Sequence, residues 1–185
     1  PTSTLDLRGH NATVTASSVF IAIEDGSGAG GMNASLYFDG GTFTVTNLTI
    51  GDKSNTSTGQ ANGSLNISGG TFSVQSGGLF TLGSQVSAGT ANAMLNLTGG
   101  TLNCLTDILA GGGSATSTLA LNGGTLNMNG NDITNLDSFI YTSGALTNLG
   151  VVNTGLTLAG AGSRVFGQGT GVSGVIQGTI SGSAV

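Results

Sequence analysis

The sequence predicts an all-β protein folded as a parallel β-solenoid (β-helix), with about three short strands per coil and roughly six coils. Three observations lead to this class: a repeat of about thirty residues, an alternation of apolar and polar residues inside each repeat, and a glycine pair at the same place in each copy. Glycine, threonine, serine and asparagine account for 98 of the 185 residues. Only one Glu and one Lys are present, so the residues that favour long helices are scarce.

The composition also excludes several classes of protein. A hydrophobic fraction of 37% and a net charge of −5 favour a folded chain, because disordered chains combine low hydrophobicity with high net charge. Three basic residues cannot neutralise a row of phosphates, so we expect no nucleic-acid partner. The longest apolar run, 19–23, is far shorter than a membrane-spanning helix, so we expect no membrane insertion.

Each repeat opens with a strand, a corner and a second strand. In each copy, period-2 alternation predicts strands with one buried face, and the Gly-Gly pair permits positive backbone angles at the corner. The copies are SLYFDGGTFTV (35–45), SLNISGGTFSV (64–74), MLNLTGGTLNC (94–104) and TLALNGGTLNM (118–128), with a degenerate copy TLDLRGHNATV at 4–14.

Equivalent positions of a solenoid lie above one another at about 4.8 Å, so the repeat predicts ladders of side chains. The leading leucines recur at spacings of 31, 29, 30 and 24. The predicted inward ladders are Leu36/Leu65/Leu95/Leu119, Phe38/Ile67/Leu97/Leu121, Phe43/Phe72/Leu102/Leu126 and Val45/Val74/Cys104/Met128. A single coil cannot bury its apolar face, and stacking is what buries it.

A third strand follows in each coil and ends at a polar loop of variable length. Ile50, Leu82 and Ala110 each precede a glycine there, and the same pattern places Asp25 beside Asp52. The repeat weakens after residue 140. We therefore divide the chain into a repeat solenoid with GGT corners, 1–140, and degenerate last coils with a Gly-rich extended segment, 141–185.

The outward positions after the corner form a flat array of short polar side chains. Three interpretations stay open: ladders that stabilise the stack, an ice-binding face, and a contact face for another copy or a glycan. We call this set the polar array; it consists of Thr42, Thr44, Thr71, Ser73, Thr101, Asn103, Thr125 and Asn127.

Acidic residues suggest one metal candidate. Glu24, Asp25 and Asp52 would bring carboxylates together in the loops, and Ca²⁺ prefers several oxygen ligands from flexible loops. A solvated acidic rim is the alternative. No other cofactor is expected.

Catalytic residues are sparse. The three basic residues are far apart in sequence, His10 is the only histidine, and Cys104 falls in an inward ladder. Reactive thiols need electropositive surroundings, and glycoside hydrolysis needs two carboxylates across a cleft. We therefore expect no enzymatic activity.

A solenoid has two open edges, which soluble examples cap with a helix or a polar repeat. The sequence shows no amphipathic helix at either end, so the chain is expected to be a fragment of a longer array or to be capped by other copies of itself. The candidates for this self-assembly are Leu5, Leu7, Val172, Val175, Ile176 and Ile180.

The segments SLNISGGTFSV, MLNLTGGTLNC and TLALNGGTLNM resemble the repeats of bacterial surface proteins. They are similar to autotransporter passenger domains with the autotransporter-associated β-strand repeat, and to repeat-rich extracellular proteins with PEP-CTERM sorting signals. The resemblance spans about residues 4–140 and implies an exported β-solenoid without catalytic residues.

The sequence thus predicts an extracellular or cell-surface protein of bacterial type, a structural subunit that stacks head to tail into a surface fibre. The alternative is a fragment of an adhesin or autotransporter passenger that binds glycans or surfaces, and a further one is an ice-binding protein.

Overall fold

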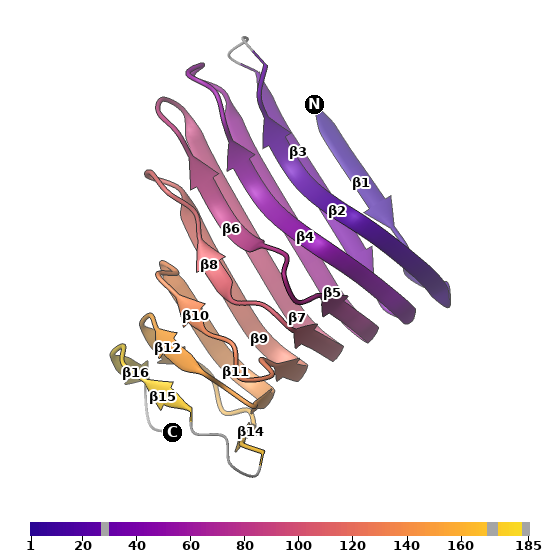
Figure 1. The fold of residues 1–185 in the computed structure, drawn as a ribbon, viewed down its shortest axis with the longest axis vertical. Helices are drawn as coiled ribbons and strands as arrows, with labels where there is room; N and C mark the ends of the chain where they lie inside the picture. Colours follow the sequence, from indigo (N-terminus) through magenta and orange to yellow (C-terminus); the bar gives the residue numbers. More distant parts are fainter. Residues whose placement is uncertain (27–29, 170–173, 183–185) are drawn as a thin grey trace.

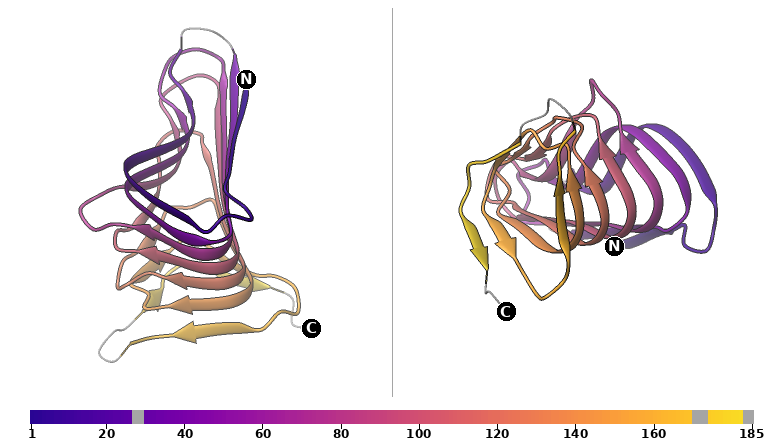
Figure 2. Two further views of the ribbon diagram at one scale, coloured as in Figure 1. Left: turned by 90° about the vertical axis from the view of Figure 1, so that its right-hand side faces the viewer. Right: turned by 90° about the horizontal axis from the view of Figure 1, so that it is seen from below.

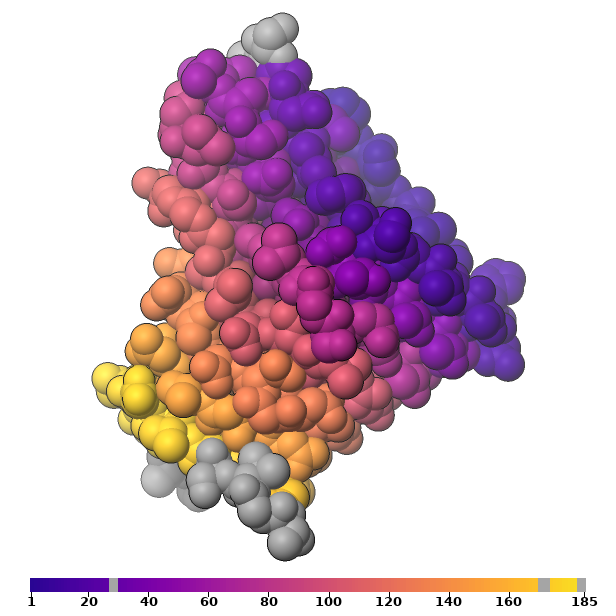
Figure 3. Space-filling model, viewed as in Figure 1, coloured from indigo at the N-terminus to yellow at the C-terminus, as the bar shows by residue number. Residues whose placement is uncertain are grey.

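The computed structural model of the chain describes residues 1–26, 30–169 and 174–182. These residues form sixteen strands and no helix, and every paired strand runs parallel to its neighbour. Figure 1 shows the strands stacked in chain order, and Figure 3 shows the coils as successive bands of colour across the surface. The chain is a parallel β-solenoid, so the predicted fold class is confirmed.

Each coil contributes one strand to each of three faces, as predicted. Face 1 precedes the glycine corner and is built from β1 (Thr2–Asp6), β3 (Gly31–Phe38), the first parts of β5 (Gln60–Val74), β7 (Thr90–Cys104), β9 (Thr116–Asn127) and β11 (Ser138–Thr147), then β13 (Leu156–Leu158) and β16 (Ile180–Gly182).

Face 2 follows the corner, and face 3 closes the coil. Face 2 contains the first parts of β2 (Ala12–Glu24) and β4 (Gly41–Lys53), the last parts of β5, β7, β9 and β11, and β14 (Arg164–Gly167). Face 3 contains the last parts of β2 and β4, then β6 (Phe80–Gln85), β8 (Ile108–Ala110), β10 (Ile133–Thr134), β12 (Val151–Asn153) and β15 (Val175–Ile176). Faces 2 and 3 therefore each stack seven strands, one coil more than the rough six that the sequence suggested.

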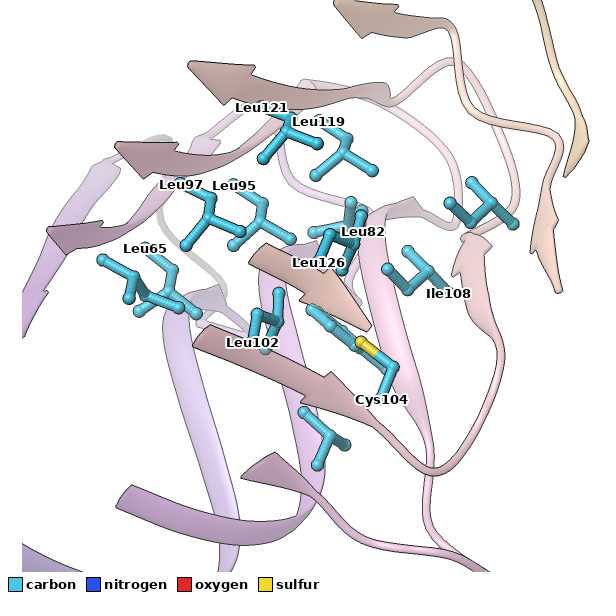
Figure 4. Close-up of a cluster of buried hydrophobic side chains, with 14 of the residues drawn as sticks. Leu65, Leu82, Leu95, Leu97, Leu102, Cys104, Ile108, Leu119, Leu121 and Leu126 are labelled. Carbon is cyan, nitrogen blue, oxygen red and sulfur yellow. The ribbon is translucent and has the colours of Figure 1, made fainter. Parts of the chain in front are cut away.

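The core consists of the ladders that the repeat predicted. Leu65 lies directly between Leu36 and Leu95, and all three are buried. The rings of Phe43 and Phe72 stack with their centroids 4.6 Å apart. Figure 4 shows leucines of successive coils pointing into one interior together with Cys104. Each large apolar side chain buried in this way contributes about 1.5–3 kcal/mol, so the ladders supply the main driving force for folding.

The corners depend on glycine for two separate reasons. Gly100 has a φ of +67°, which residues with a Cβ rarely adopt. A Cβ at this position would also lie 2.5 Å from the carbonyl carbon of Gly69, in the corner of the preceding coil. Stacked corners therefore require glycine at the same place in each repeat.

The interior narrows at one level between face 1 and face 3, and we call this constriction the waist. A Cβ on Gly63 of face 1 would lie 2.5 Å from the carbonyl oxygen of Ile21 and 2.7 Å from the amide nitrogen of Gly51, both on face 3. Face 1 and face 3 thus touch backbone to backbone, and Figure 2 shows the ribbons approaching there in the left view. The waist separates the leucine core from a smaller compartment under the polar loops, which we call the loop lobe.

The waist also corrects the predicted alignment of the third strand. The predicted alignment of Asp25 with Asp52 also implies that Ile23 matches Ile50, but the register pairs Ile21 with Ile50 and Ile23 with Asp52. The reason is that Ala22 lies opposite Gly51, and both have positive φ, 59° and 68°. The backbone leaves the extended conformation at this point in both coils, so the conformation rather than the hydrophobic pattern sets the register.

The last coils are smaller and less regular. Strands β10 and β15 have two residues each, and the pairing of β11 with β9 shifts register between Tyr141 and Ala145. The hydroxyl of Tyr141 lies 2.8 Å from the carbonyl oxygens of both Gly144 and Val165, and it accepts a hydrogen bond from the Val165 amide. In the last coils, the side chain of Tyr141 therefore makes hydrogen bonds to backbone groups that, in the regular coils, pair with the backbone of a neighbouring strand.

Candidate functional site

The polar array is continuous along face 2. Its two columns, Thr42/Thr71/Thr101/Thr125 and Thr44/Ser73/Asn103/Asn127, follow the strand register from coil to coil. The preceding coil adds Thr13 and Thr15 to the columns, and the following coil adds Ala145 and Thr147. These residues therefore stack in two columns from coil to coil.

Part of the array is used to join coils. The Asn127 side-chain amide donates to Asn103 Oδ1 at 3.1 Å, and Asn148 donates to Asn127 Oδ1 at 2.9 Å. These bonds favour the stabilising interpretation for the asparagine end of the array. Ice binding by the threonine end stays a prediction, which a thermal hysteresis measurement on the wild type and a Thr44→Tyr variant tests.

Face 1 carries a second polar surface that the sequence analysis missed. Asn33, Asn62 and Asn92 stack in register. The Asn62 amide donates to Asn33 Oδ1 at 2.8 Å, and the Asn92 amide donates to Asn62 Oδ1 at 2.6 Å. They border a groove of about 380 Å³ on the outer surface above the waist. Its remaining lining residues are Thr2, Ala34, Ser35, Gly63, Ser64, Ala93, Met94, Thr116 and Thr118. The spacings of 29 and 30 residues between the asparagines were a signal for this ladder.

The three acidic candidates do not form the arrangement that the sequence suggested. Asp52 lies opposite Ile23, and Asp25 follows the end of β2, so the two carboxylates are not stacked. Glu24 points into the loop lobe and is 7% exposed. Among the residues that the structure describes, no group of three His, Cys, Asp or Glu side chains could hold a metal ion. The expectation of a calcium site rested on the misaligned register and is withdrawn.

The loop lobe instead contains a column of buried polar side chains. Glu24, Lys53 and Gln85 occupy equivalent positions in three successive coils and are all buried. Lys53 Nζ donates to the backbone oxygen of Asn55 at 3.0 Å and also to Asn55 Oδ1. Gln85 Nε2 donates to the backbone oxygens of Ser87 and Gly89 at 2.8 and 2.6 Å. Lys53 and Gln85 thus each brace the loop that follows them.

Apolar side chains are exposed at both ends of the stack. At the first coil, Leu5 and Phe20 border a hollow of about 160 Å³ between β1 and β2. At the other end, Val175 and Ile180 are exposed together with Val165 and Phe166. Leu7 and Ile176 are half-buried against the core. Val172, the remaining self-assembly candidate, lies outside the described residues.

The other titratable groups have structural surroundings. Burial raises the pKa of the Cys104 thiol, which disfavours the thiolate that nucleophilic chemistry needs. Arg8 pairs with Asp6 at 2.6 Å rather than with the Asp39 of the next coil. The side-chain hydrogen bond from Arg8 lowers the pKa of Asp6 from 3.8 to about 2.

Comparisons with protein-family models, curated proteins and solved structures found no match for this chain. The described residues include no helix long and apolar enough to cross a membrane.

Proposed function

We propose that this protein is an extracellular structural subunit, and that its copies stack end to end into a surface fibre or matrix filament. One observation carries the proposal. Leu5 and Ile180 are the two ends of one inward ladder, and they are 52% and 55% exposed. The positions between them are Leu36, Leu65, Leu95, Leu119, Phe139 and Leu156, all of which are buried.

A second copy could continue this ladder at either end. The edge strands β1 and β16 each pair with a single strand among those described, which leaves backbone donors and acceptors free on the other side. A contact that places Ile180 of one copy on Leu5 of the next is head to tail and does not close, so it builds a filament. With only 11 charged side chains, little repulsion opposes this contact. The extracellular location rests on the same composition and on the near absence of cysteine.

Sedimentation over a concentration series, with negative-stain electron microscopy, tests this function. We expect rods that lengthen with concentration. Leu5→Asp or Ile180→Asp should stop their growth, because each buries a charge in the contact. The matched control is Thr4→Asp, which adds the same charge at an exposed position next to Leu5. Monomers at every concentration of the wild type would contradict the proposal.

A second function, glycan binding by an adhesin, is favoured by the groove on face 1. The amides and hydroxyls that line it recur from coil to coil, and no charged residue lines it. A neutral, hydroxyl-rich chain lying along the stack would meet the same groups at each coil. Binding of neutral polysaccharides measured by calorimetry should be lost in Ser64→Phe, which fills the groove. Equal binding by this variant would eliminate the groove as the site.

A further inference from the structure

The loop lobe contains a buried amine without a carboxylate partner in contact. Lys53 is the only lysine of the chain and is 0% exposed. Its Nζ is not within ion-pair distance of Glu24, the one buried acid among the described residues. Burying an ammonium group away from a counter-charge costs several kcal/mol, so this position needs an explanation. Its hydrogen-bond partners are two oxygens of Asn55.

Bracing the loop does not explain the choice of lysine. In the next coil the equivalent residue is Gln85, a neutral side chain that holds the carbonyl of Ser87 in the same way, two residues further on. A neutral brace avoids the cost of burying a charge. The two coils also differ in the residue that is held, because Lys53 meets an amide side chain and Gln85 does not. Of these two coils, the one that has lysine at this position is also the one that places a side-chain amide, that of Asn55, beside it. An amine can attack such an amide.

We propose that Lys53 and Asn55 become covalently joined in the folded chain by an amide bond between Nζ and Cγ. The electron pair of Nζ forms the new bond to Cγ, and the bond from Cγ to Nδ2 breaks. The two protons that the ammonium group gives up end on the departing nitrogen, which leaves as ammonium ion. No oxidant, reductant or cofactor takes part. The hydrogen bond between Nζ and Oδ1 already holds the nucleophile against the amide, which is the main requirement for an intramolecular reaction.

Glu24 is the group placed to carry the protons. It is the register partner of Lys53 in the preceding coil and shares its buried compartment. Glu24 Oε1 lies close to Gly26: if that glycine carried a Cβ atom, the two atoms would be 3.7 Å apart. The carbonyl oxygen of the same Gly26 accepts a hydrogen bond from Asn55 Nδ2. The carboxylate and the leaving nitrogen therefore lie against the same residue. The resting structure keeps Nζ beyond ion-pair distance of Glu24, so the Lys53 side chain must first turn towards the carboxylate. Glu24 then takes the two protons of Nζ in succession, returns each to Nδ2 and ends the reaction unchanged.

The composition of the chain offers a simple assay. Lys53 is the only lysine, so a protease specific for lysine cuts the denatured wild-type chain once, and only while the Nζ amine is free. We expect the denatured protein to resist this cut and to have an intact mass lower than the sequence mass by one ammonia. Cleavage into fragments 1–53 and 54–185 with the full sequence mass overturns the proposal.

Controls separate the cross-link from other losses of ammonia. Cyclisation of an asparagine onto its following glycine gives the same mass loss but leaves Lys53 cleavable, so a light, cleavable chain also overturns the proposal. Asn55→Ala should restore both the full mass and the cut, whereas Asn62→Ser, which removes an Asn-Gly pair elsewhere, should restore neither. When chains that have not yet folded are allowed to fold for the first time, Glu24→Gln should lose ammonia at least tenfold more slowly than the wild type, and an unchanged rate overturns the role of Glu24. These readouts do not depend on filament formation.

Discussion

The coils between residues 31 and 104 and those between 138 and 182 follow the same winding but are held together differently. In the first region, long strands pair in register on both sides of the glycine corner, with an irregularity between β5 and β7 only at the corner itself, and buried aromatic and aliphatic ladders run without interruption. In the second, strands shrink to two to four residues after β11, and polar side chains bridge the gaps. Arg164 is an example, because it donates to the backbone oxygens of Tyr141 and Gly160 at 2.7 and 2.8 Å.

The difference shows what a regular repeat contributes physically. Where each coil has the same pattern as the coil before it, the same stacking forms the backbone hydrogen bonds and buries the apolar side chains. The buried side chains then need only match one another in size. Where the repeat decays, backbone groups lose their partners, and an unpaired buried group costs about 1–3 kcal/mol. Tyr141 and Arg164 supply those partners one at a time. We therefore expect the first region to respond to changes of volume and the second to changes of hydrogen bonding.

The largest expected effect is in the first region. Phe72→Ala should lower the free energy of unfolding by about 3–5 kcal/mol, because it leaves a cavity beside Phe43 and Phe38. Urea unfolding followed by circular dichroism measures this change. Leu158→Ala, at a partly buried position of the last coils, should cost less than half as much. Equal costs would show that the two regions do not differ in packing.

The next effect concerns the corners of the regular region. Gly100→Ala should cost about 1–3 kcal/mol from the positive φ alone, and more because the new Cβ meets the preceding corner. Gly77→Ala is the matched control, since Gly77 has a φ of +74° but no atom within 4 Å of its Cβ position. The difference between the two variants in urea unfolding measures the cost of stacking. If they are equally stable, close approach of the coils does not matter at the corner.

A smaller and local effect is expected in the last coils. Tyr141→Phe removes the hydroxyl that serves the Val165 amide and a carbonyl oxygen, at a cost of about 1–2 kcal/mol. Hydrogen exchange should show faster exchange of the Val165 amide while amides near Leu65 keep their protection. Faster exchange throughout the stack would mean that both regions unfold as one unit.

The smallest effect is at the exposed Asp6–Arg8 pair. Because the folded pKa of Asp6 is about 2 and its ordinary value is 3.8, the pair stabilises the fold above pH 3.8 and stops doing so as the pH falls towards 2. Both side chains are about half exposed, so the effect on stability is slight. Titration of the Asp6 carboxyl group by NMR should give a midpoint near 2 that returns towards 3.8 in Arg8→Gln. A wild-type midpoint at 3.8 would show that the pair does not form in solution.

Much of the polar surface could be predicted from the repeat, but the buried polar column could not. The threonine columns follow directly from the spacing of the corners, because outward positions alternate with inward ones. Glu24 was assigned to a solvated rim or a calcium site, since a lone carboxylate gives no local sign of burial. Its place inside the loop lobe depends on Ala22, whose positive φ changes which side chains at the end of β2 point inward.

The sequence by itself determined the class of fold, the corners and the leucine and phenylalanine ladders, because a period-2 pattern repeated about every thirty residues fixes which side chains point inward. Only the tertiary structure decided the register of the third strand, the waist at Gly51 and Gly63, and the burial of Lys53 in the loop lobe. These features arise where backbones from different faces approach within contact distance. Such an approach depends on residues far apart along the chain, so no local pattern encodes it.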